Sequence, residues 1–560
     1  MKRSVLIVIA VLLAAAGGFW LIRSQQGATA PPLPDSGPVG ATLLEGLGNY
    51  SMPVTSDHPE VQRWFDQGLM LTYGFNHDAA ERSFLKAAEL DPECAMCWWG
   101  AALVLGPHVN AGMDPANVPL AMERIRRAQQ ATGASERERA YIEALSTRYA
   151  AEPGDDRRPL DEAYAAAMAQ LVAQYPDDLD AATMHVEALM DLQPWDYWDA
   201  EGNPRGNSAE IVSRLEAVIA RNPDHAGALH LYVHAVEASN DPARGVAAAD
   251  HLRTLIPGSG HLVHMPAHIY ARVGRYHDAV LANQVAIAAD DAYLATCRPR
   301  PGVYPLGYVP HNHHFMWFAA TMEGASAIAV DAAKATGERT SDPQLMRTPG
   351  FEAMQVFSLT PLFAAVRFGH WDDVAAMPRP ADDLPYMVAM WHYAQGTAAA
   401  NQGRLDDART HHEPLRAAAS DAGIEQMKVW DRYSVINGVR IGERLLAAEI
   451  ARAEKDYAAA ASALREAVVY EDEIPYDEPP GWHAPVRQKL GAVLLQAGDA
   501  AAAEATFREE LRRNPENGWS LFGLEQSLRA QGRAKEADEV AGRLELAWAN
   551  ADVELSVAAL

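Results

Sequence analysis

The sequence predicts an all-α fold in which helical hairpins stack into an α-solenoid, and three observations support this prediction. The chain has 560 residues, which is too long for one ordinary core, so several domains or a repeat array are expected. Hydrophobic residues make up 49% and charged residues 22% of the chain, a composition that is globular and not disordered. Alanine is abundant, and β-branched runs are scarce after the first 22 residues, which favours helix.

A recurring spacing of small, aromatic and proline residues identifies the repeat. Within 485–515 it comprises Gly491, Gly498, Ala503, Phe507 and Pro515. Small residues let two helices approach closely, the glycine turns the chain, and the proline ends the second helix. The same spacing recurs at Trp64, Gly68, Ala80, Phe84 and Pro92, at Gly396, Gly403 and Ala408, and at Gly532 and Ala537. This is the pattern of the tetratricopeptide repeat (TPR), so we expect a TPR-like superhelix in which each helix pair is covered by its neighbour.

The first 23 residues predict a transmembrane anchor or signal segment. Lys2 and Arg3 precede an uncharged run of 19 residues, 4–22, which Arg23 closes. Such a run can just cross a bilayer as a helix, and positive charge ahead of it exports the rest of the chain. We expect an uncleaved anchor over 1–23, with a cleaved signal peptide as the alternative, followed by a Pro-rich linker over 24–45. The protein is then expected at the periplasmic face of the inner membrane, touching the membrane through this helix only, or in the periplasm if the segment is cleaved.

Behind the linker, the sequence predicts three groups of repeats. These are N-terminal repeats with a cysteine pair over 46–175, central histidine-rich repeats over 176–340, and C-terminal TPR repeats over 341–560. The net charge of −27 repels nucleic acid and anionic lipid, so no nucleic-acid partner is expected. The same charge mildly favours cationic ligands, metal ions included.

Histidines recur at matching places in the central repeats. His261, His264 and His268 are spaced by three and four residues, which puts their side chains on one helix face. His230 and His234 lie 34 residues before His264 and His268, one TPR period. The register set by the turn glycine Gly274 places these histidines on first helices, at positions that face the concave groove in TPR architecture. The corresponding places in the flanking units are taken by His185, His311 and His314.

These histidines predict a metal site. Two histidines at i and i+4 on a helix can hold one ion together, and adjacent helices can add ligands. Neutral imidazole suits copper and zinc, and Glu237 could be a further ligand or a hydrogen-bond partner of one. Two alternatives stay open. The groove could bind a peptide through hydrogen bonds and charge, or the histidines could be incidental.

Two insertions interrupt the histidine-bearing repeats, at 193–207 and 293–314. Both are rich in aromatic residues, Pro and Gly, so we expect ordered loops and not extra helices. Trp195, Tyr197 and Trp198 in the first insertion are costly to leave exposed, and the second carries Tyr304 and Tyr308. We expect both insertions to fold over the groove and narrow it into a ligand pocket.

The three cysteines of the chain are too few for a disulfide framework. Pro92 ends one predicted helix, so Cys94 and Cys97 fall in the first turn of the next, where a thiolate is stabilised. A redox-active pair, a structural disulfide and two buried thiols are all compatible with this placement. Trp98 stands where a c-type haem site needs histidine, so no haem is expected. The absence of a Gly-rich phosphate loop likewise predicts no nucleotide.

The segments CAMCWWG, GPHVN, PWDYWD, GHLVHMPAHIYARVGRYHDA and HNHHF together resemble a group of exported bacterial TPR proteins of about this length. The resemblance spans nearly all of the chain from about residue 45. It implies the fold and a joint role for these His, Cys and aromatic residues, but no activity is firmly assigned to the group.

The predicted function is therefore a periplasmic TPR binding protein whose groove holds copper, zinc or a metal-bearing ligand. A metal-dependent enzyme using the same histidines is one alternative. A metal-free TPR scaffold that binds a peptide or partner protein, in the groove or on the C-terminal repeats, is the other.

Overall fold

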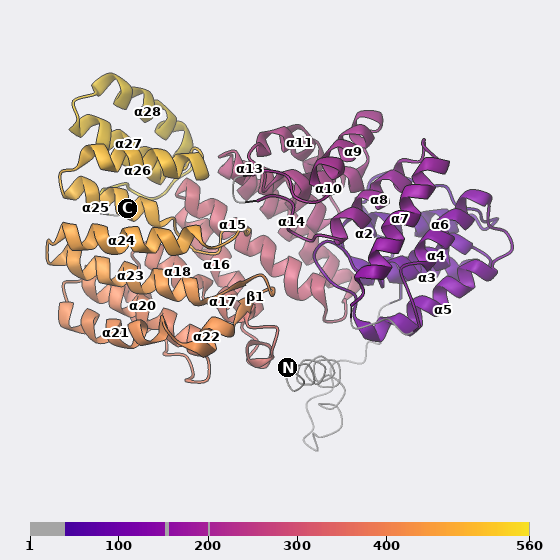
Figure 1. Ribbon diagram of the computed structural model, residues 1–560, viewed down its shortest axis with the longest axis horizontal. Coiled ribbons are helices and arrows are strands. Elements are labelled where there is room, and N and C mark those ends of the chain that lie inside the picture. Colours follow the sequence, from indigo (N-terminus) through magenta and orange to yellow (C-terminus); the bar gives the residue numbers. More distant parts are fainter. Residues whose placement is uncertain (1–39, 152–155, 200–201, 559) are drawn as a thin grey trace, which may run out of the picture. The chain divides into compact units, whose positions relative to one another are not determined.

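The computed structural model describes residues 40–151, 156–199, 202–558 and 560. In this part of the chain the regular structure is helical apart from one two-stranded sheet, which confirms the predicted all-α class (Figure 1). The predicted anchor over 1–23 and most of the linker over 24–45 lie outside the described residues. Among the residues described, no helix combines the length and the apolar character needed to span a bilayer.

The chain forms two compact units. The N-terminal unit runs through Ile269 and takes up Gln284–Val309 as well, whereas the C-terminal unit comprises Tyr270–Asn283 and Pro310–Leu560. The predicted three-part division at 175 and 340 stays a prediction.

The helices of the N-terminal unit, with those that pass between the units, are α2 (Val61–Tyr73), α3 (His77–Leu90), α4 (Ala95–Leu103), η1 (Pro115–Asn117), α5 (Val118–Gln130), α6 (Glu136–Ser146), α7 (Arg158–Gln174), α8 (Leu179–Asp191), α9 (Ser208–Arg221), α10 (Ala226–Val236), η2 (Pro242–Gly245), α11 (Val246–Leu255), α12 (Gly260–His264), α13 (Pro266–Arg272), α14 (Tyr276–Cys297) and η3 (Tyr304–Tyr308).

The C-terminal unit continues with α15 (Val309–Glu323), α16 (Ser326–Thr340), η4 (Leu345–Arg347), α17 (Ala353–Ser358), α18 (Thr360–Arg367), α19 (Trp371–Ala376), α20 (Pro385–Asn401), α21 (Leu405–Ala418), α22 (Ala422–Gln426), the strands β1 (Lys428–Val429) and β2 (Tyr433–Ser434), α23 (Ile436–Ala453), α24 (Tyr457–Asp472), α25 (Val486–Gln496), α26 (Ala500–Arg513), α27 (Gly518–Ala530) and α28 (Ala534–Ala547). The two strands pair antiparallel, with Lys428 opposite Ser434.

Phenylalanines set between glycines explain how the helical hairpins stack. Phe84 of α3 is fully buried between α2 and α4, where a Cβ added at Gly68 or Gly100 would lie 2.7 Å and 2.6 Å from its ring. Phe507 of α26 occupies the same place in the C-terminal unit, between Gly491 of α25 and Gly523 of α27. In each unit, one aromatic ring therefore joins the first helices of two successive hairpins, which is the packing that the repeat spacing predicts.

The turns inside several hairpins use one residue in the left-handed region. Gly274 has φ +80°, and the next residue, Arg275, donates its N–H to the carbonyl of Tyr270 over 2.8 Å. Gly498 has φ +83° in the same arrangement, with Asp499 donating to Leu494 over 2.9 Å. Glycine suits this position because it has no Cβ to clash with the preceding turn.

The two insertions differ in structure. The described residues of the first, 193–199 and 202–207, form a loop, as predicted, and an isolated bridge between Trp198 and Pro204 stabilises it. The predicted loop over 293–314 is wrong, because helix α14 continues to Cys297, residues 304–308 form one π-helical turn and α15 begins at Val309. Pro305 and Pro310 fall in the first turns of these helices, where proline lacks only an N–H that would be unsatisfied anyway.

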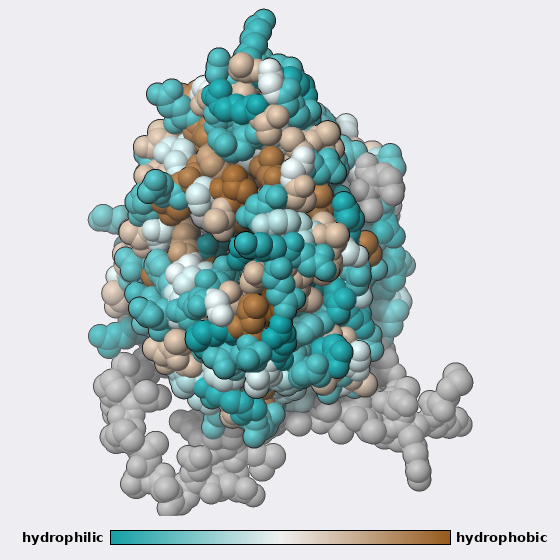
Figure 2. Space-filling model, turned by 90° about the vertical axis from the view of Figure 1, so that its left-hand side faces the viewer, coloured by the Kyte–Doolittle hydropathy of each residue, from teal (hydrophilic) through white to brown (hydrophobic). Residues whose placement is uncertain are grey.

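Hydrophilic side chains cover most of the face drawn in Figure 2, with smaller patches of hydrophobic ones among them. Few large hydrophobic side chains are strongly exposed among the described residues. The most exposed are Leu546 at 80% and Val469 at 56%. Scattered apolar residues of this kind are ordinary on a soluble surface and need no ligand to explain them.

Candidate metal centre

Five histidines of the N-terminal unit lie on helices α10, α12 and α13, and we call them the histidine cluster. Its members are His230, His234, His261, His264 and His268. The helix predicted through His261, His264 and His268 is interrupted at Pro266, between α12 and α13. The N–H of Met265 donates to the carbonyl of His261, four residues earlier, whereas the N–H of His268 donates to the carbonyl of Met265, three residues earlier. The break leaves the i and i+4 pair intact, since the Nε2 atoms of His264 and His268 lie 2.7 Å apart.

Three members of the cluster form the core of the site. The candidate ligand atoms of His230, His234 and His261 all lie within 4.8 Å of one another. The ring of His230 is 4.9 Å from those of both His234 and His261, measured between centroids. The three side chains are between 0% and 2% exposed, so they meet inside the unit and not at its surface.

Hydrogen bonds fix the tautomer of two of these rings. The Nδ1 atom of His230 lies 2.6 Å from the carbonyl of Tyr73, and that of His234 lies 3.1 Å from Glu237 Oε1. A carbonyl and an ionised carboxylate only accept, so each Nδ1 carries the proton and each Nε2 keeps its lone pair. Both Nε2 atoms are buried and have no hydrogen-bond partner among the described residues.

Glu237 joins two parts of the histidine cluster. Its side chain is fully buried, with Oε1 against His234 and Oε2 2.8 Å from Nδ1 of His268. If both Nδ1 atoms donate to this carboxylate, Nε2 of His268 accepts the N–H of His264. A carboxylate that receives hydrogen bonds from imidazoles orients them and raises their basicity toward a metal.

Burial keeps the imidazoles neutral. Loss of solvation holds the pKa of His230 well below its usual value. Desolvation also lowers the pKa of His234, although the hydrogen bond and charge of Glu237 oppose that shift. Neutral imidazole is the form that coordinates metal, so the rings are in a ligating state at neutral pH.

Phe75 encloses the cluster from the α2–α3 turn. Its ring is 4.5 Å from that of His230, 5.5 Å from that of His261 and 4.6 Å from that of His108, on which it stacks. Phe75 is 3% exposed, and its φ is +54°, in the left-handed region that a bulky residue seldom adopts. The turn therefore places an apolar ring against the imidazoles at the expense of backbone strain.

Two more histidines extend the site beyond what the sequence predicted. The ring centroids of His77 and His108 are 4.6 Å apart. Desolvation lowers the pKa of His77 to about 4 and that of His108 well below its usual value. Nδ1 of His77 lies 3.0 Å from the carbonyl of Val104, and its Nε2 is buried with no partner in the part of the chain described. His108 belongs to the GPHVN segment, which was the one signal for it.

Both insertions contact the cluster. Trp195 lies edge-to-face on His234 at 5.4 Å, and Trp198 Nε1 donates to the carbonyl of Ala235 over 2.8 Å. The ring of Tyr308 lies 4.4 Å from that of His261, and the hydroxyl of Tyr304 accepts the His261 backbone N–H. Side chains of both insertions therefore pack on these histidines, as expected, and Tyr197 of the first insertion is 3% exposed. The ligand pocket that the insertions were expected to form stays a prediction.

The remaining predicted ligands are His185, His311 and His314. His185 is buried on α8, desolvation lowers its pKa to about 4, and its ring makes no aromatic contact among the described residues. His311 and His314 lie on α15 in the C-terminal unit, where the ring of His314 stacks on Trp317 at 5.2 Å. A metal-binding role for these three stays a prediction.

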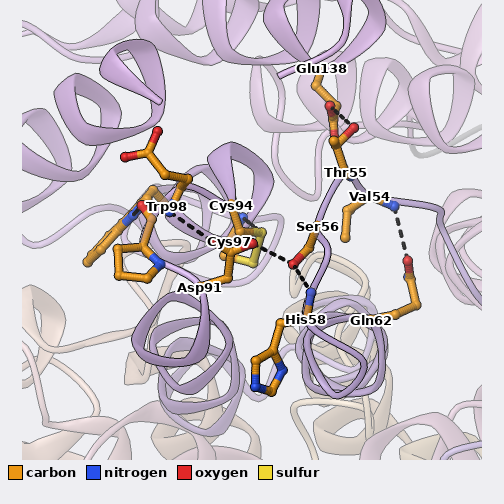
Figure 3. The surroundings of a disulfide bond; sticks show 12 residues. Val54, Thr55, Ser56, His58, Gln62, Asp91, Cys94, Cys97, Trp98 and Glu138 are labelled. Carbon is orange, nitrogen blue, oxygen red and sulfur yellow. Dashed lines mark hydrogen bonds between the residues drawn. A yellow bond between two sulfur atoms is a disulfide. The ribbon is translucent and has the colours of Figure 1, made fainter. Parts of the chain in front are cut away.

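Cys94 and Cys97 form a disulfide at the start of α4 (Figure 3). Cys94 is the N-cap residue, and the N–H of Cys97 donates to its sulfur over 3.2 Å. Both cysteines are 0% exposed, so an external thiol has no access to the bond. This geometry favours the structural disulfide over the redox-active pair. Cys297 is a buried free thiol, and burial raises its pKa.

Comparisons with known proteins show limited likeness. No family model matches the chain. The cellulose synthase operon protein C of Xanthomonas axonopodis pv. citri (strain 306) is 34% identical over 149 residues, which are 27% of this chain and 9% of that protein. The chain therefore spans less than a tenth of the length of this curated relative.

Similar solved structures are helical-repeat assemblies at low identity. The APC/C hetero-tetramer Cut9–Hcn1 is 13% identical with a TM-score of 0.30, over 92% of this chain and 82% of that chain. The human IFIT1 dimer with m7Gppp-AAAA is 13% identical with a TM-score of 0.30, over 88% of this chain and 91% of that chain. Yeast Tom70 is 11% identical with a TM-score of 0.25, over 86% of this chain and 89% of that chain. At these TM-scores the likeness supports no functional assignment.

Proposed function

We propose that the N-terminal unit binds one transition-metal ion, copper or zinc, through His230, His234 and His261. The observation that supports this most strongly is the pair of buried Nε2 atoms, on His230 and His234, that have no partner among the described residues. A buried polar atom left without a hydrogen bond costs about 1–3 kcal/mol. A bound ion would take up both lone pairs at once.

The spacing of the three rings is close to that of a metal site. A tetrahedral ion with metal–nitrogen bonds of about 2.0–2.1 Å keeps its ligand atoms about 3.3–3.4 Å apart. The three ligand atoms are within 4.8 Å of one another, so binding would draw them together by small rotations of the rings. The carbonyl of Tyr73 and the carboxylate of Glu237 already hold Nδ1 of His230 and His234. Metal binding therefore needs to immobilise these two rings less.

Burial supports a binding role over turnover. A metal-dependent enzyme needs an open coordination position that a substrate can reach. The three ligand side chains are at most 2% exposed, and Trp195 and Tyr308 pack directly on them. We therefore assign the site to holding a metal, and the surrounding helical hairpins to a scaffold for a partner protein. Location in the periplasm remains part of this proposal.

Metal analysis tests the proposal. Protein purified without a polyhistidine tag should carry about one equivalent of copper or zinc, or should bind it in calorimetry after chelation. His234→Ala should weaken binding by more than the roughly 10–100-fold that loss of an outer hydrogen-bond partner costs. Glu237→Gln should fall within that 10–100-fold range.

The matched control is His251→Ala. His251 belongs to the same unit, pairs with Asp224 on the surface and has a 44% exposed side chain, so its loss should leave affinity unchanged. Wild-type protein with no bound copper or zinc, and no micromolar affinity for either, would overturn the proposal. Equal losses in His234→Ala and His251→Ala would do so too.

A further inference from the structure

Arg367 of the C-terminal unit is a half-buried cation whose Nε atom is fully buried. It is the last residue of α18, its guanidinium lies 3.8 Å from the ring centre of Trp519, and its Nη2 donates to Gln488 Oε1 over 2.6 Å. Among the described residues it makes no ion pair within 4.0 Å, and its Nε is buried with no hydrogen-bond partner. Desolvation lowers its pKa to about 10, against the opposing influence of Tyr393 and Glu510.

Neutral donors with no partner lie in the same part of the unit. Trp482 Nε1, His483 Nδ1 and Thr397 Oγ1 are each buried without a hydrogen-bond partner in the described part of the chain. Trp482 and His483 precede α25, and Thr397 is on α20. The ring of His483 stacks on Phe363 of α18 at 4.6 Å and lies 4.5 Å from that of Trp482.

Phe363 and Arg367 lie four residues apart on the same face of α18, so the guanidinium lies near the ring of His483, which stacks on Phe363. The charge of Arg367 lowers the pKa of His483, adding to the larger effect of desolvation that brings it to about 3. Burial raises the pKa of Tyr393, and the same guanidinium opposes that rise. The hydroxyl of Tyr393 lies 3.5 Å from His483 Nε2 and its ring 5.7 Å from that of Trp482. A cation, an imidazole and an indole therefore lie near one another, beside the rings of Phe363 and Tyr393.

We propose that this cluster, Arg367 with Trp482 and His483, binds a carboxylate carried on an apolar group. A buried charge is strongly destabilising unless it is paired, and guanidinium pairs with carboxylate through charge-assisted hydrogen bonds. A neutral imidazole and an indole N–H supply further donors without adding charge. One cation matches a singly charged anion better than phosphate, and the rings of Phe363 and Trp482 offer an apolar wall for the attached group.

Calorimetry on the intact protein tests this inference with four probes. Isovalerate represents a free small acid, and acetyl-Ala-Ala-Leu with a free carboxylate represents a chain terminus. The amide of the same tripeptide and inorganic phosphate complete the set. At least one carboxylate should bind with millimolar affinity or better, and the amide should not. Whichever acid binds identifies the source of the carboxylate.

Arg367→Gln should reduce the affinity about 10–100-fold, the usual effect of losing a hydrogen bond to a charged group. The control is Arg416→Gln, since the Arg416 side chain is 61% exposed and, among the described residues, forms an ion pair only with Glu413 on the same helix. If Arg367→Gln does not fold, His483→Phe keeps an aromatic ring on Phe363 but removes the Nδ1 donor, and it should still lower the affinity several-fold.

Absence of binding by either acid at about 10 mM would overturn the proposal and indicate that ordered water satisfies these donors. Tighter binding of phosphate than of either acid would overturn the assignment to carboxylate. An unchanged affinity in both Arg367→Gln and His483→Phe would place the ligand elsewhere. His230→Ala should bind the probes as wild type does, so failure of the metal proposal and failure of this one are separable.

Discussion

Phe75 shows how one residue can be held in an unfavourable conformation by its surroundings. The N–H of the next residue, Asn76, donates to the carbonyl of Leu71 over 2.8 Å. In the turn at Gly274, the N–H of Arg275 makes the corresponding hydrogen bond to the carbonyl of Tyr270. Phe75 thus occupies a turn position that suits glycine. A bulky residue there costs about 1–3 kcal/mol, which its contacts with the rings of the histidine cluster must offset.

Replacement of Phe75 by glycine should therefore have two opposing effects. Relief of strain should stabilise the fold by about 1–3 kcal/mol, less about 0.5–1 kcal/mol for the greater flexibility of glycine, but loss of a buried ring should cost about 3–5 kcal/mol. We expect a net loss of about 2–4 kcal/mol in the free energy of unfolding by urea, together with weaker metal binding.

Lys455→Gly is the matched control for this change. Lys455 has φ +64° in the corresponding turn between α23 and α24, and its side chain is exposed. This variant should gain about 0.5–1 kcal/mol, since strain is relieved and no packing is lost. Destabilisation by Lys455→Gly, or none by Phe75→Gly, would contradict the account of Phe75.

At this scale the sequence predicted which histidines come together, and that the insertions fold over them, but not the contacts made by Tyr73 and Phe75. The histidines were visible in the sequence because His230 and His234 lie one repeat period before His264 and His268, and His261 lies three residues before His264. The carbonyl of Tyr73 is 157 residues away from His230 in the chain, and Phe75 bears no local mark of its role. Contacts of such long range depend on how hairpins stack, which residue patterns within one hairpin do not encode.

The helical hairpin is the element on which stability depends, through its small residues. Gly491 of α25 faces the ring of Phe507, and a Cβ there would collide with it. A phenyl ring held on both sides by glycines has no free direction in which to move. The glycine is needed for close approach of the helices, although alanine is the better helix former.

Gly491→Ala should lower the free energy of unfolding by about 1–3 kcal/mol, because overpacking outweighs the gain of up to about 1 kcal/mol in helix propensity. Gly542→Ala is the control, since nothing lies within 4 Å of a Cβ at that position of α28. It should raise the stability by about 0.5–1 kcal/mol. Urea unfolding of the two variants should thus give opposite signs, and equal signs would refute the packing argument.

Elements were predicted well where repeat spacing governs them and badly where it is interrupted. The hairpins around Phe84 and Phe507 follow from short-range spacing. The helical structure over 293–314 was missed because Pro and Gly were taken as loop signals. Buried contacts such as that of Tyr304 with Asp290, over 2.8 Å, help to hold this segment in place, and tertiary contacts override local propensity.

For the whole molecule, buried carboxyl groups make stability depend on pH. Glu510 of α26 is 1% exposed and accepts a hydrogen bond from Asn514 over 2.7 Å. Desolvation raises its pKa to about 7, against the lowering effects of Asn514, Arg487 and Arg513, while Glu509 adds to the rise. The folded state therefore holds a proton that the unfolded chain has already lost between about pH 4.5 and pH 7.

Glu510→Gln should remove this dependence. The stability contributed by the protonated group is complete below about pH 4.5 and is lost as the pH rises through about 7, by up to about 3 kcal/mol. The variant should match wild type near pH 4.5 and exceed it at pH 8 in urea unfolding.

Glu509→Gln provides the contrast, because hydrogen bonds from Arg512 and Arg513 lower the pKa of Glu509 to about 2. That variant should lose stability at neutral pH. A constant difference between wild type and Glu510→Gln across this pH range would contradict the assignment.

The crossing of the chain between the two compact units has a consequence for biosynthesis. Residues 270–283 belong to the C-terminal unit, yet the N-terminal unit still needs Gln284–Val309, which supply Tyr304 and Tyr308 against His261. During translation, the imidazoles of α10 and α12 thus emerge from the ribosome before the side chains that cover them. The proposed metal ion would enter most easily in that interval, so metal loading would be coupled in time to completion of the fold.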